Sequence, residues 1–151
     1  MQSNRRIGRE IRIVDNLLRR RFVRDLKRIA GNDVTVIQVW ILKYISDSEP
    51  DDIFQKDIEK EFEIAKSTAT STLKLMERKE LITRVQVPYD ERLKKLCLTD
   101  KGRRITQEMW ESARTADNEL VKDIDDKRLE VFYSVLDEIK KKCGDADIEK
   151  E

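Results

Sequence analysis

Apolar residues recur every three or four positions through most of this chain, which is the spacing of one face of an α-helix. In residues 5–29 they form a single stripe, and arginines cover the rest of the predicted helix. The same spacing predicts five further helices, which cover residues 36–45, 54–62, 66–81, 100–120 and 127–142.

One stretch follows a different pattern. Residues 81–87, "LITRVQV", alternate and are rich in β-branched side chains, as β-strands are. Residues 94–99, "KKLCLT", are the predicted antiparallel partner, and Thr99 then suits the N-cap of the next helix. We therefore predict one β-hairpin with a charged connection, which carries Asp90, Glu91, Arg92, Lys94 and Lys95.

The predicted order is four helices, a hairpin and two helices. Two short helices at a tight turn, followed by a charged hairpin, are typical of a winged helix-turn-helix. We therefore predict a mainly α fold with a small β-hairpin wing. The apolar stripes of the first and the last two helices are more than this small domain can cover, so we expect a homodimer. The predicted regions are an N-terminal dimerisation helix (1–33), a winged helix-turn-helix (34–99), C-terminal dimerisation helices (100–143) and a flexible tail (144–151).

Composition excludes several kinds of catalytic site. The chain has 151 residues and no histidine, so Ser–His or Cys–His pairs, imidazole bases and most zinc or iron sites are ruled out. Its four glycines stand apart, so no glycine-rich phosphate loop exists. We expect no cofactor and no enzyme activity. The polar start "MQSNRRIGRE" and the lack of an apolar run near ~20 residues predict a cytoplasmic protein without a membrane partner.

Charge is sorted along the chain, although the formal net charge is only +1. Residues 1–30 carry +7 and residues 84–104 carry +4, whereas residues 31–83 carry −4 and residues 105–151 carry −6. The basic first helix is either a DNA surface or a surface that meets the acidic C-terminal part of a second copy. We favour the second interpretation, because opposite local charges also steer correct pairing.

The helix predicted at 66–81 begins with small polar residues, "KSTATS". Such a front can enter the major groove of DNA, where hydroxyl and ammonium groups bind base edges or phosphates. The alternative is an ordinary solvated helix start, since Ser and Thr are common there. The candidate DNA-binding residues of this helix are Lys66, Ser67, Thr68, Thr70, Ser71 and Lys74.

The basic hairpin connection favours the DNA interpretation over a merely solvated hairpin tip. Arg92, Lys94 and Lys95 can lie along phosphates, or one guanidinium can enter the narrow minor groove, where negative potential is concentrated. Asp90 can hold Arg92 by a charge-assisted pair, so that less side-chain entropy is lost on binding. These four residues complete the candidate DNA-binding set.

At this point the chain resembles a known family. The pattern Asp90-x-Arg92-x5-Leu98-Thr99-x2-Gly102 resembles the wing-to-helix motif of the MarR family of winged helix-turn-helix transcriptional regulators. "VTVIQVWILKYI", "FQKDIEKEF" and "STATSTLKLMERKELI" are similar to that family's second helix and its two turn-motif helices. The resemblance spans about residues 7–142. It implies an obligate homodimer with terminal helices at the interface, a recognition helix over 66–74, and Arg92 in the minor groove with Asp90 as its partner.

Three positions depart from the family's pattern. Glu63 and Glu80 stand where the family often has glycine, at the turn and after the recognition helix. Ala65 occupies the place of a usual serine N-cap. A non-glycine residue that must be left-handed costs about 1 kcal/mol.

Three aromatic residues and one cysteine have two interpretations each. Family members often bind small amphipathic or aromatic effectors between the winged domain and the dimer helices, and Trp40, Tyr44 and Trp110 could line such a site. At helical spacing, however, they are more typical of a core. Cys97, on the second predicted strand, is either an inert half-buried residue, which we favour, or a redox switch.

Together these features predict a sequence-specific transcription regulator, in particular a repressor. It would bind a pseudo-palindromic site on double-stranded DNA as a homodimer and be released by a small-molecule ligand. The alternative is a winged-helix module that binds another protein and has no DNA specificity.

Overall fold

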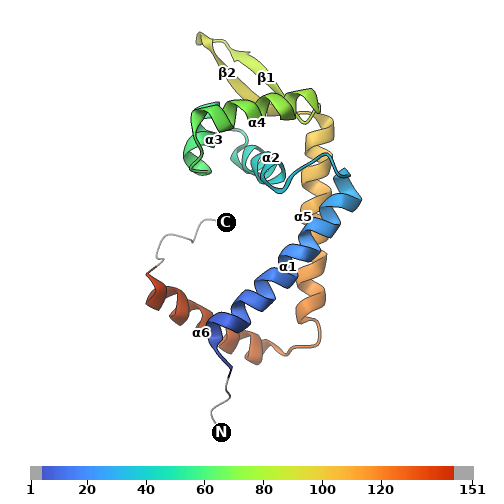
Figure 1. The fold of residues 1–151 in the computed structure, drawn as a ribbon, viewed down its shortest axis with the longest axis vertical. Coiled ribbons are helices and arrows are strands. Elements are labelled where there is room, and N and C mark those ends of the chain that lie inside the picture. The colour runs from blue at the N-terminus through green and yellow to red at the C-terminus, as the bar shows by residue number, and fades with distance from the viewer. Residues whose placement is uncertain (1–4, 145–151) are drawn as a thin grey trace. The chain divides into compact units, whose positions relative to one another are not determined.

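The computed structural model describes residues 5–144, which form six helices and one two-stranded antiparallel sheet (Figure 1). The predicted fold class, mainly α with a small β-hairpin, is therefore confirmed. The elements are α1 (Ile7–Ala30), α2 (Val36–Ser48), α3 (Gln55–Glu61), α4 (Lys66–Arg78), β1 (Ile82–Val87), β2 (Asp90–Leu98), α5 (Asp100–Val121) and α6 (Asp126–Cys143).

The described residues belong to two compact units, which divide between Ser112 and Ala113 within α5. The first unit holds the helix pair α3–α4 and the hairpin, and the second holds α6. The region boundaries given by the sequence remain a prediction. Among residues 5–144, none of the helices combines the length and the apolar character that a membrane span requires.

The core of the first unit is built on α2. This helix buries five of its 13 residues, because apolar side chains are present on most of its circumference. The predicted stripe of α4, Ala69, Leu73 and Met76, is fully buried, as is Ile58 of α3. This core is completed by Leu81, which precedes β1, by Ile82 of β1, and by Ile105 and Met109 of α5.

Both ends of α4 have the local structure that the departures from the family pattern imply. Glu63, in the turn before α4, has φ 49°, and Glu80, after α4, has φ 58°. Both are left-handed positions that glycine adopts more easily than glutamate. Ala65 is the N-cap of α4 and makes no side-chain cap hydrogen bond. The helix pair therefore forms without glycine at its turn or a hydroxyl at its cap.

The hairpin differs in one respect from the prediction. β2 starts at Asp90, four residues before the predicted start at Lys94, and pairs with Val87 across the two turn residues Pro88 and Tyr89. The next pair is Gln86 with Lys94, so β2 has three extra residues, 91–93, which form a bulge. The charged connection is thus a bulged strand rather than a long loop.

The junction between β2 and α5 explains the Leu-Thr-x2-Gly part of the motif. The Thr99 hydroxyl donates to the carbonyls of Glu80 and Leu81 and accepts from the Gly102 N–H at 3.0 Å, as predicted for an N-cap. A Cβ on Gly102 would lie 2.1 Å from the Leu81 carbonyl oxygen. Only glycine therefore allows α5 to start this close to the end of α4.

The terminal helices bury much less than the winged part. α1 has one buried residue, Leu26, among 24, and α6 has none among 18. Gly144 ends α6 in a left-handed conformation with φ 88°. The rest of the predicted tail, residues 145–151, lies outside the described residues. The exposed apolar side chains of these two helices include Ile7, Ile11, Val14, Leu17, Leu18, Val131, Phe132, Tyr133 and Val135.

Candidate nucleic-acid interface

The front of α4 presents a polar, uncrowded face. Lys66, Ser67, Thr68 and Lys74 are exposed, and their side chains make no hydrogen bond or ion pair with the rest of residues 5–144. The buried side of the same helix faces the core through the apolar stripe given above. This face is therefore free to meet a ligand.

Two other predicted residues of α4 use their hydroxyls within the protein. The Thr70 hydroxyl donates to the Lys66 carbonyl at 2.8 Å and accepts from the Gln55 amide of α3 at 2.8 Å. The Ser71 hydroxyl donates to the Thr68 carbonyl at 3.0 Å. Thr70 is half-buried, so its hydroxyl holds α3 against α4, whereas exposed Ser71 can still turn outward.

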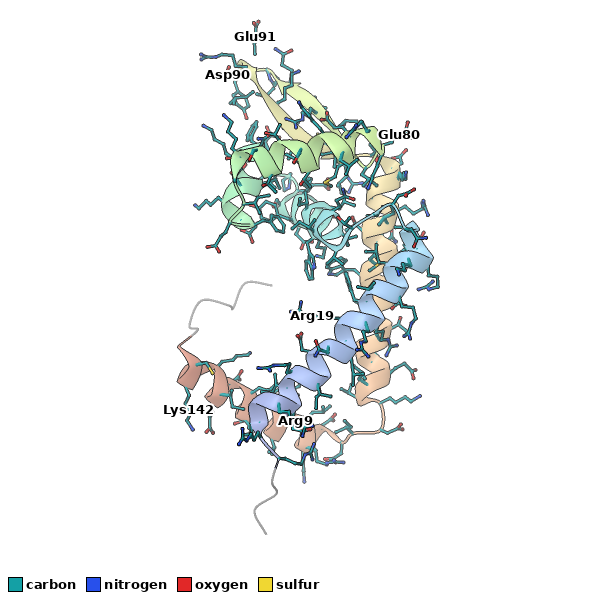
Figure 2. All side chains as sticks on the ribbon, viewed as in Figure 1. Arg9, Arg19, Glu80, Asp90, Glu91 and Lys142 are labelled. Atoms are coloured by element: carbon teal, nitrogen blue, oxygen red, sulfur yellow. The ribbon has the colours of Figure 1, made fainter. Side chains whose placement is uncertain are left out.

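The wing tip projects Arg92. Its side chain is 91% exposed and belongs to the bulge of β2, and neighbouring Asp90 and Glu91 lie at the outer end of the hairpin (Figure 2). Asp90 Oδ1 accepts from the Arg92 backbone N–H at 2.9 Å and from Arg92 Nε at 3.5 Å. The predicted pair of Asp90 and Arg92 is thus present, but its main bond orients the backbone of the bulge. The guanidinium remains free to move outward.

The two wing lysines differ. Lys94 is exposed and shares a face of the hairpin with Gln86, its partner across the ladder. Lys95 turns to the other face, where its ammonium lies 2.8 Å from Asp52 Oδ1, and Tyr89 donates a hydrogen bond to Asp52 Oδ2 at 3.3 Å. The bond from Lys95 holds the pKa of the Asp52 carboxyl below its ordinary value. Lys95 therefore anchors the wing to the segment before α3.

Four residues of this region were missed by the sequence reasoning. Arg84 of β1 lies 3.0 Å from the Glu77 carboxylate of α4 and donates to the Gln55 amide oxygen at 3.4 Å. Asp52, described above, is a fourth. Alternation along β1 places Arg84 on the face that carries Ile82. This alternation was the only feature of the sequence that could have indicated a role for Arg84, because its partners are distant in sequence.

The three candidate ligand residues belong to two aromatic clusters. Trp40 stacks on Phe22 with ring centroids 6.0 Å apart and meets Trp110 edge-on at 5.3 Å. The Lys43 ammonium lies 5.0 Å from the Trp110 ring centroid, a cation–π distance. Tyr44 instead packs edge-on against Phe62 of the α3–α4 turn. Trp110 and Tyr44 pack against the core, whereas Trp40 is 37% exposed.

The basic surface of α1 is largely unpaired within the described residues. Arg5 pairs with Glu10 and Arg19 with Asp15, both within the helix or at its start. Arg9, labelled with Arg19 in Figure 2, makes no ion pair with any side chain of residues 5–144. The same is true of several exposed arginines on this helix, namely Arg6, Arg12, Arg20 and Arg24.

Taken together, α3, α4 and the bulged hairpin define a winged helix-turn-helix. The model of the MarR family matches residues 32–93. No curated protein matches the chain by sequence.

Solved structures with the same fold cover nearly the whole chain. A mutant of Staphylococcus aureus MepR bound to an oligodeoxyribonucleotide is 21% identical, with 93% of this chain and 99% of that chain covered and a TM-score of 0.71. MepR bound to ethidium bromide is 22% identical, with coverage of 93% and 99% and a TM-score of 0.72. The transcription regulator MarR from Oenococcus oeni is 27% identical, with coverage of 90% and 99% and a TM-score of 0.61.

The resemblance inferred from the wing motif is therefore confirmed. Residues 32–93 match the model of the MarR family, and the chain has the fold of MarR-family transcription regulators.

Proposed function

We propose that this protein is a sequence-specific DNA-binding transcription regulator, a repressor, and not an enzyme. The observation that carries the proposal is the pairing of an unobstructed α4 front with a wing that exposes Arg92. Lys66, Ser67, Thr68 and Lys74 offer donors and acceptors to base edges and phosphates, and no bulky apolar group blocks them. The MepR structure that contains an oligodeoxyribonucleotide has the same fold, which supports this proposal. A cytoplasmic location is part of this proposal.

In this proposal α4 lies in the major groove and the wing reaches the flanking minor groove. Serine and threonine hydroxyls contact bases or phosphates, and lysine reaches guanine or the backbone. Arg92 enters the minor groove, because a guanidinium sheds its water more readily than an ammonium. Lys94 follows the phosphates, while Lys95 and Thr70 act mainly within the protein through Asp52 and Gln55.

We further propose a homodimer formed by residues 1–33 and 100–143, with one winged domain, residues 34–99, per half-site. Support comes from the exposed apolar faces of α1 and α6, which need a partner. A two-fold axis then requires a pseudo-palindromic operator with half-sites about one helical turn, ~10 bp, apart. The unpaired arginines of α1 would meet the acidic residues of the partner's C-terminal part, as opposite local charges favour.

A small aromatic or amphipathic effector is the proposed signal for release of DNA. Trp40 offers an exposed ring face, and Trp110 and Tyr44 lie in the adjoining aromatic clusters of α2 and α5. MepR, which has the same fold, is known in a structure with ethidium bromide, a flat aromatic cation. In the Trp40→Ala variant the effector should no longer release the protein from DNA. The affinity for DNA in the absence of effector should not change.

Selection of binding sites from random duplex DNA tests the main proposal. An enriched palindrome is expected, and binding to it should be salt-dependent. If the dimer neutralises about 6–10 phosphates, affinity falls by roughly 10³–10⁵-fold between 50 and 200 mM salt. Absence of any enriched sequence with the pure dimer would contradict the proposal and favour a protein-binding module.

A further inference from the structure

Four side chains connect the recognition helix to both of its neighbours. Arg84 of β1 lies 3.0 Å from Glu77 of α4 and donates to the Gln55 amide oxygen of α3 at 3.4 Å. The Gln55 amide nitrogen in turn donates to Thr70 of α4 at 2.8 Å and to Glu59 of its own helix at 3.0 Å. We call Gln55, Thr70, Glu77 and Arg84 the wing-helix network.

The network holds α4 at two places. Thr70 and Glu77 are seven residues apart, about two helical turns or roughly 10 Å, and they lie on nearly the same side of the helix. One end is tied to α3 through Gln55 and the other to β1 through Arg84. Because Gln55 and Arg84 also bond each other, α3, α4 and β1 form one closed chain of contacts.

The hairpin needs such a support. It leaves α4 through Glu80, a left-handed residue. In β1 only the two end residues, Ile82 and Val87, are buried, and residues 83–86 between them are not. Arg84 and Lys95 lie on neighbouring rungs of the ladder and so point to opposite faces. Arg84 ties one face to α4, and Lys95 ties the other to Asp52. Rotation of the wing about its base would have to break one of these ties.

We propose that Arg84 and Gln55 are positioning residues that fix the wing relative to α4, so that both reach their grooves in one orientation. The inference rests on the proposed function. The Arg84 side chain is only 24% exposed, whereas that of Arg92 at the wing tip is 91% exposed, so Arg84 is much less accessible to a phosphate. The network therefore acts on DNA binding through geometry, and Thr70 serves this network instead of reading a base.

Glu77→Gln separates geometry from charge. Removal of a negative charge beside DNA should by itself strengthen binding to phosphates. The positioning role predicts the opposite, because Arg84 loses its ionic partner and a neutral amide oxygen holds the wing less firmly. We expect operator affinity to fall by roughly three- to tenfold, in the range of coupled neighbouring sites, while binding to unrelated duplex DNA does not fall.

The experiment compares Glu77→Gln, Arg84→Gln and the double variant on the selected operator and on unrelated duplex DNA, at several salt concentrations. The double variant should lose no more affinity than either single variant, and the salt slope of Glu77→Gln should equal that of the wild type. The matched control removes another interelement pair, Glu49 with Arg103, 2.7 Å apart, through Arg103→Gln. This control should lower thermal stability equally and keep the ratio of specific to non-specific affinity.

Tighter operator binding by Glu77→Gln would overturn the positioning role. A second result would also overturn it: the salt slope of DNA binding falls by about one in Arg84→Gln, while Glu77→Gln binds the operator normally. Arg84 would then be a phosphate contact.

A second readout does not depend on DNA. Spin labels at Arg78→Cys and Glu91→Cys, in a background with Cys97→Ala and Cys143→Ala, report the distance between the end of α4 and the wing tip. Arg84→Gln should broaden the distance distribution, and Arg103→Gln should not. If Arg84→Gln broadens the distance distribution but no operator is selected from random DNA, the positioning role is retained and the proposed function is rejected. An unchanged distribution in Arg84→Gln would overturn the positioning role by itself.

Discussion

The winged part and the terminal helices use apolar residues in opposite ways. α2 buries five of 13 residues against its own chain, whereas α1 buries one of 24 and α6 none of 18. Yet α1 and α6 both carry apolar stripes, with side chains as exposed as Leu17 at 59% and Val131 at 64%. The winged part thus has its own core, and the terminal helices have apolar faces that remain to be covered.

Burial of these faces would favour association of two copies. Full burial of one Val, Leu, Ile or Phe side chain contributes about 1.5–3 kcal/mol. Several such side chains on two helices can offset the entropy of association, while a monomer would leave them in water. Substitutions in the two regions should therefore differ in kind: those in the winged part affect unfolding or DNA binding, and those in the terminal helices affect association.

The largest effect is expected inside the winged part. In Gly102→Ala the new Cβ would meet the Leu81 carbonyl oxygen at 2.1 Å and a Leu42 methyl at 3.2 Å. The start of α5 must then shift, and the free energy of unfolding should fall by about 4 kcal/mol or more. Urea denaturation followed by circular dichroism measures this. The control is Gly8→Ala, at a glycine whose added Cβ would have no atom within 4 Å, and this substitution should be neutral or stabilising. Equal losses of stability at both positions would refute the steric explanation.

The next effect should appear only in the association of the terminal helices. Leu18→Glu puts a charge on the exposed apolar stripe of α1, and burial of that charge in an interface costs several kcal/mol. The dissociation constant of the dimer should rise by about a hundredfold or more, as measured by sedimentation velocity. Asn16→Glu on the same helix adds the same charge away from the stripe, and the dimer should tolerate it. Similar losses in both variants would mean that α1 does not use this stripe.

A smaller effect, on DNA affinity alone, is expected at the wing tip. Arg92→Ala removes the exposed guanidinium and should weaken operator binding by about 1–3 kcal/mol, as read by fluorescence anisotropy. The dimer and its thermal stability should not change. Dissociation of the Arg92→Ala dimer would show that the wing belongs to the association surface and would erase the contrast between the two regions.

Replacement of either left-handed glutamate by glycine should stabilise the fold. Glu80→Gly should raise the free energy of unfolding by up to about 1 kcal/mol, because glycine adopts φ 58° without the side-chain penalty. Glu63→Gly, at φ 49°, should behave alike. The control is Glu59→Gly, inside α3, which should destabilise. A loss of stability in Glu80→Gly would mean that its side chain, not its backbone, matters at this junction.

The smallest expected effect concerns the wing anchor at Asp52. The hydrogen bond from Lys95 lowers the pKa of Asp52 in the folded protein, so this carboxylate stabilises the fold above its unfolded pKa. The contribution is lost as the pH falls through the lowered folded pKa. An NMR titration should place Asp52 below its ordinary value of 3.8, and Lys95→Gln should move it back toward that value. An unchanged titration in Lys95→Gln would contradict the anchor.

Much of this molecule follows from local patterns in the sequence. The stripe of α4, the N-cap at Thr99 and the left-handed positions 63 and 80 each depend on a few neighbouring residues, and the structure contains all of them. The fold class and the family resemblance were predicted from the same patterns and are confirmed.

The contacts that were not predicted join segments far apart in the chain. Asp52 with Lys95 and Gln55 with Arg84 are separated by 43 and 29 positions, and no periodicity marks such partners. The bulge of β2 was missed for a related reason: three unpaired residues are a property of the ladder, not of either strand. The bond from Gln55 to Thr70 was not predicted either, because the two residues lie 15 positions apart on different helices.

The central claim is that two copies, joined by their terminal helices, place two recognition helices on one duplex. The mass of the complex with a duplex that carries one selected operator, measured by sedimentation velocity, tests this directly. Two chains per duplex are expected, and half an operator should bind far more weakly. One chain per duplex, bound as tightly to a half-site as to the full operator, would contradict the claim.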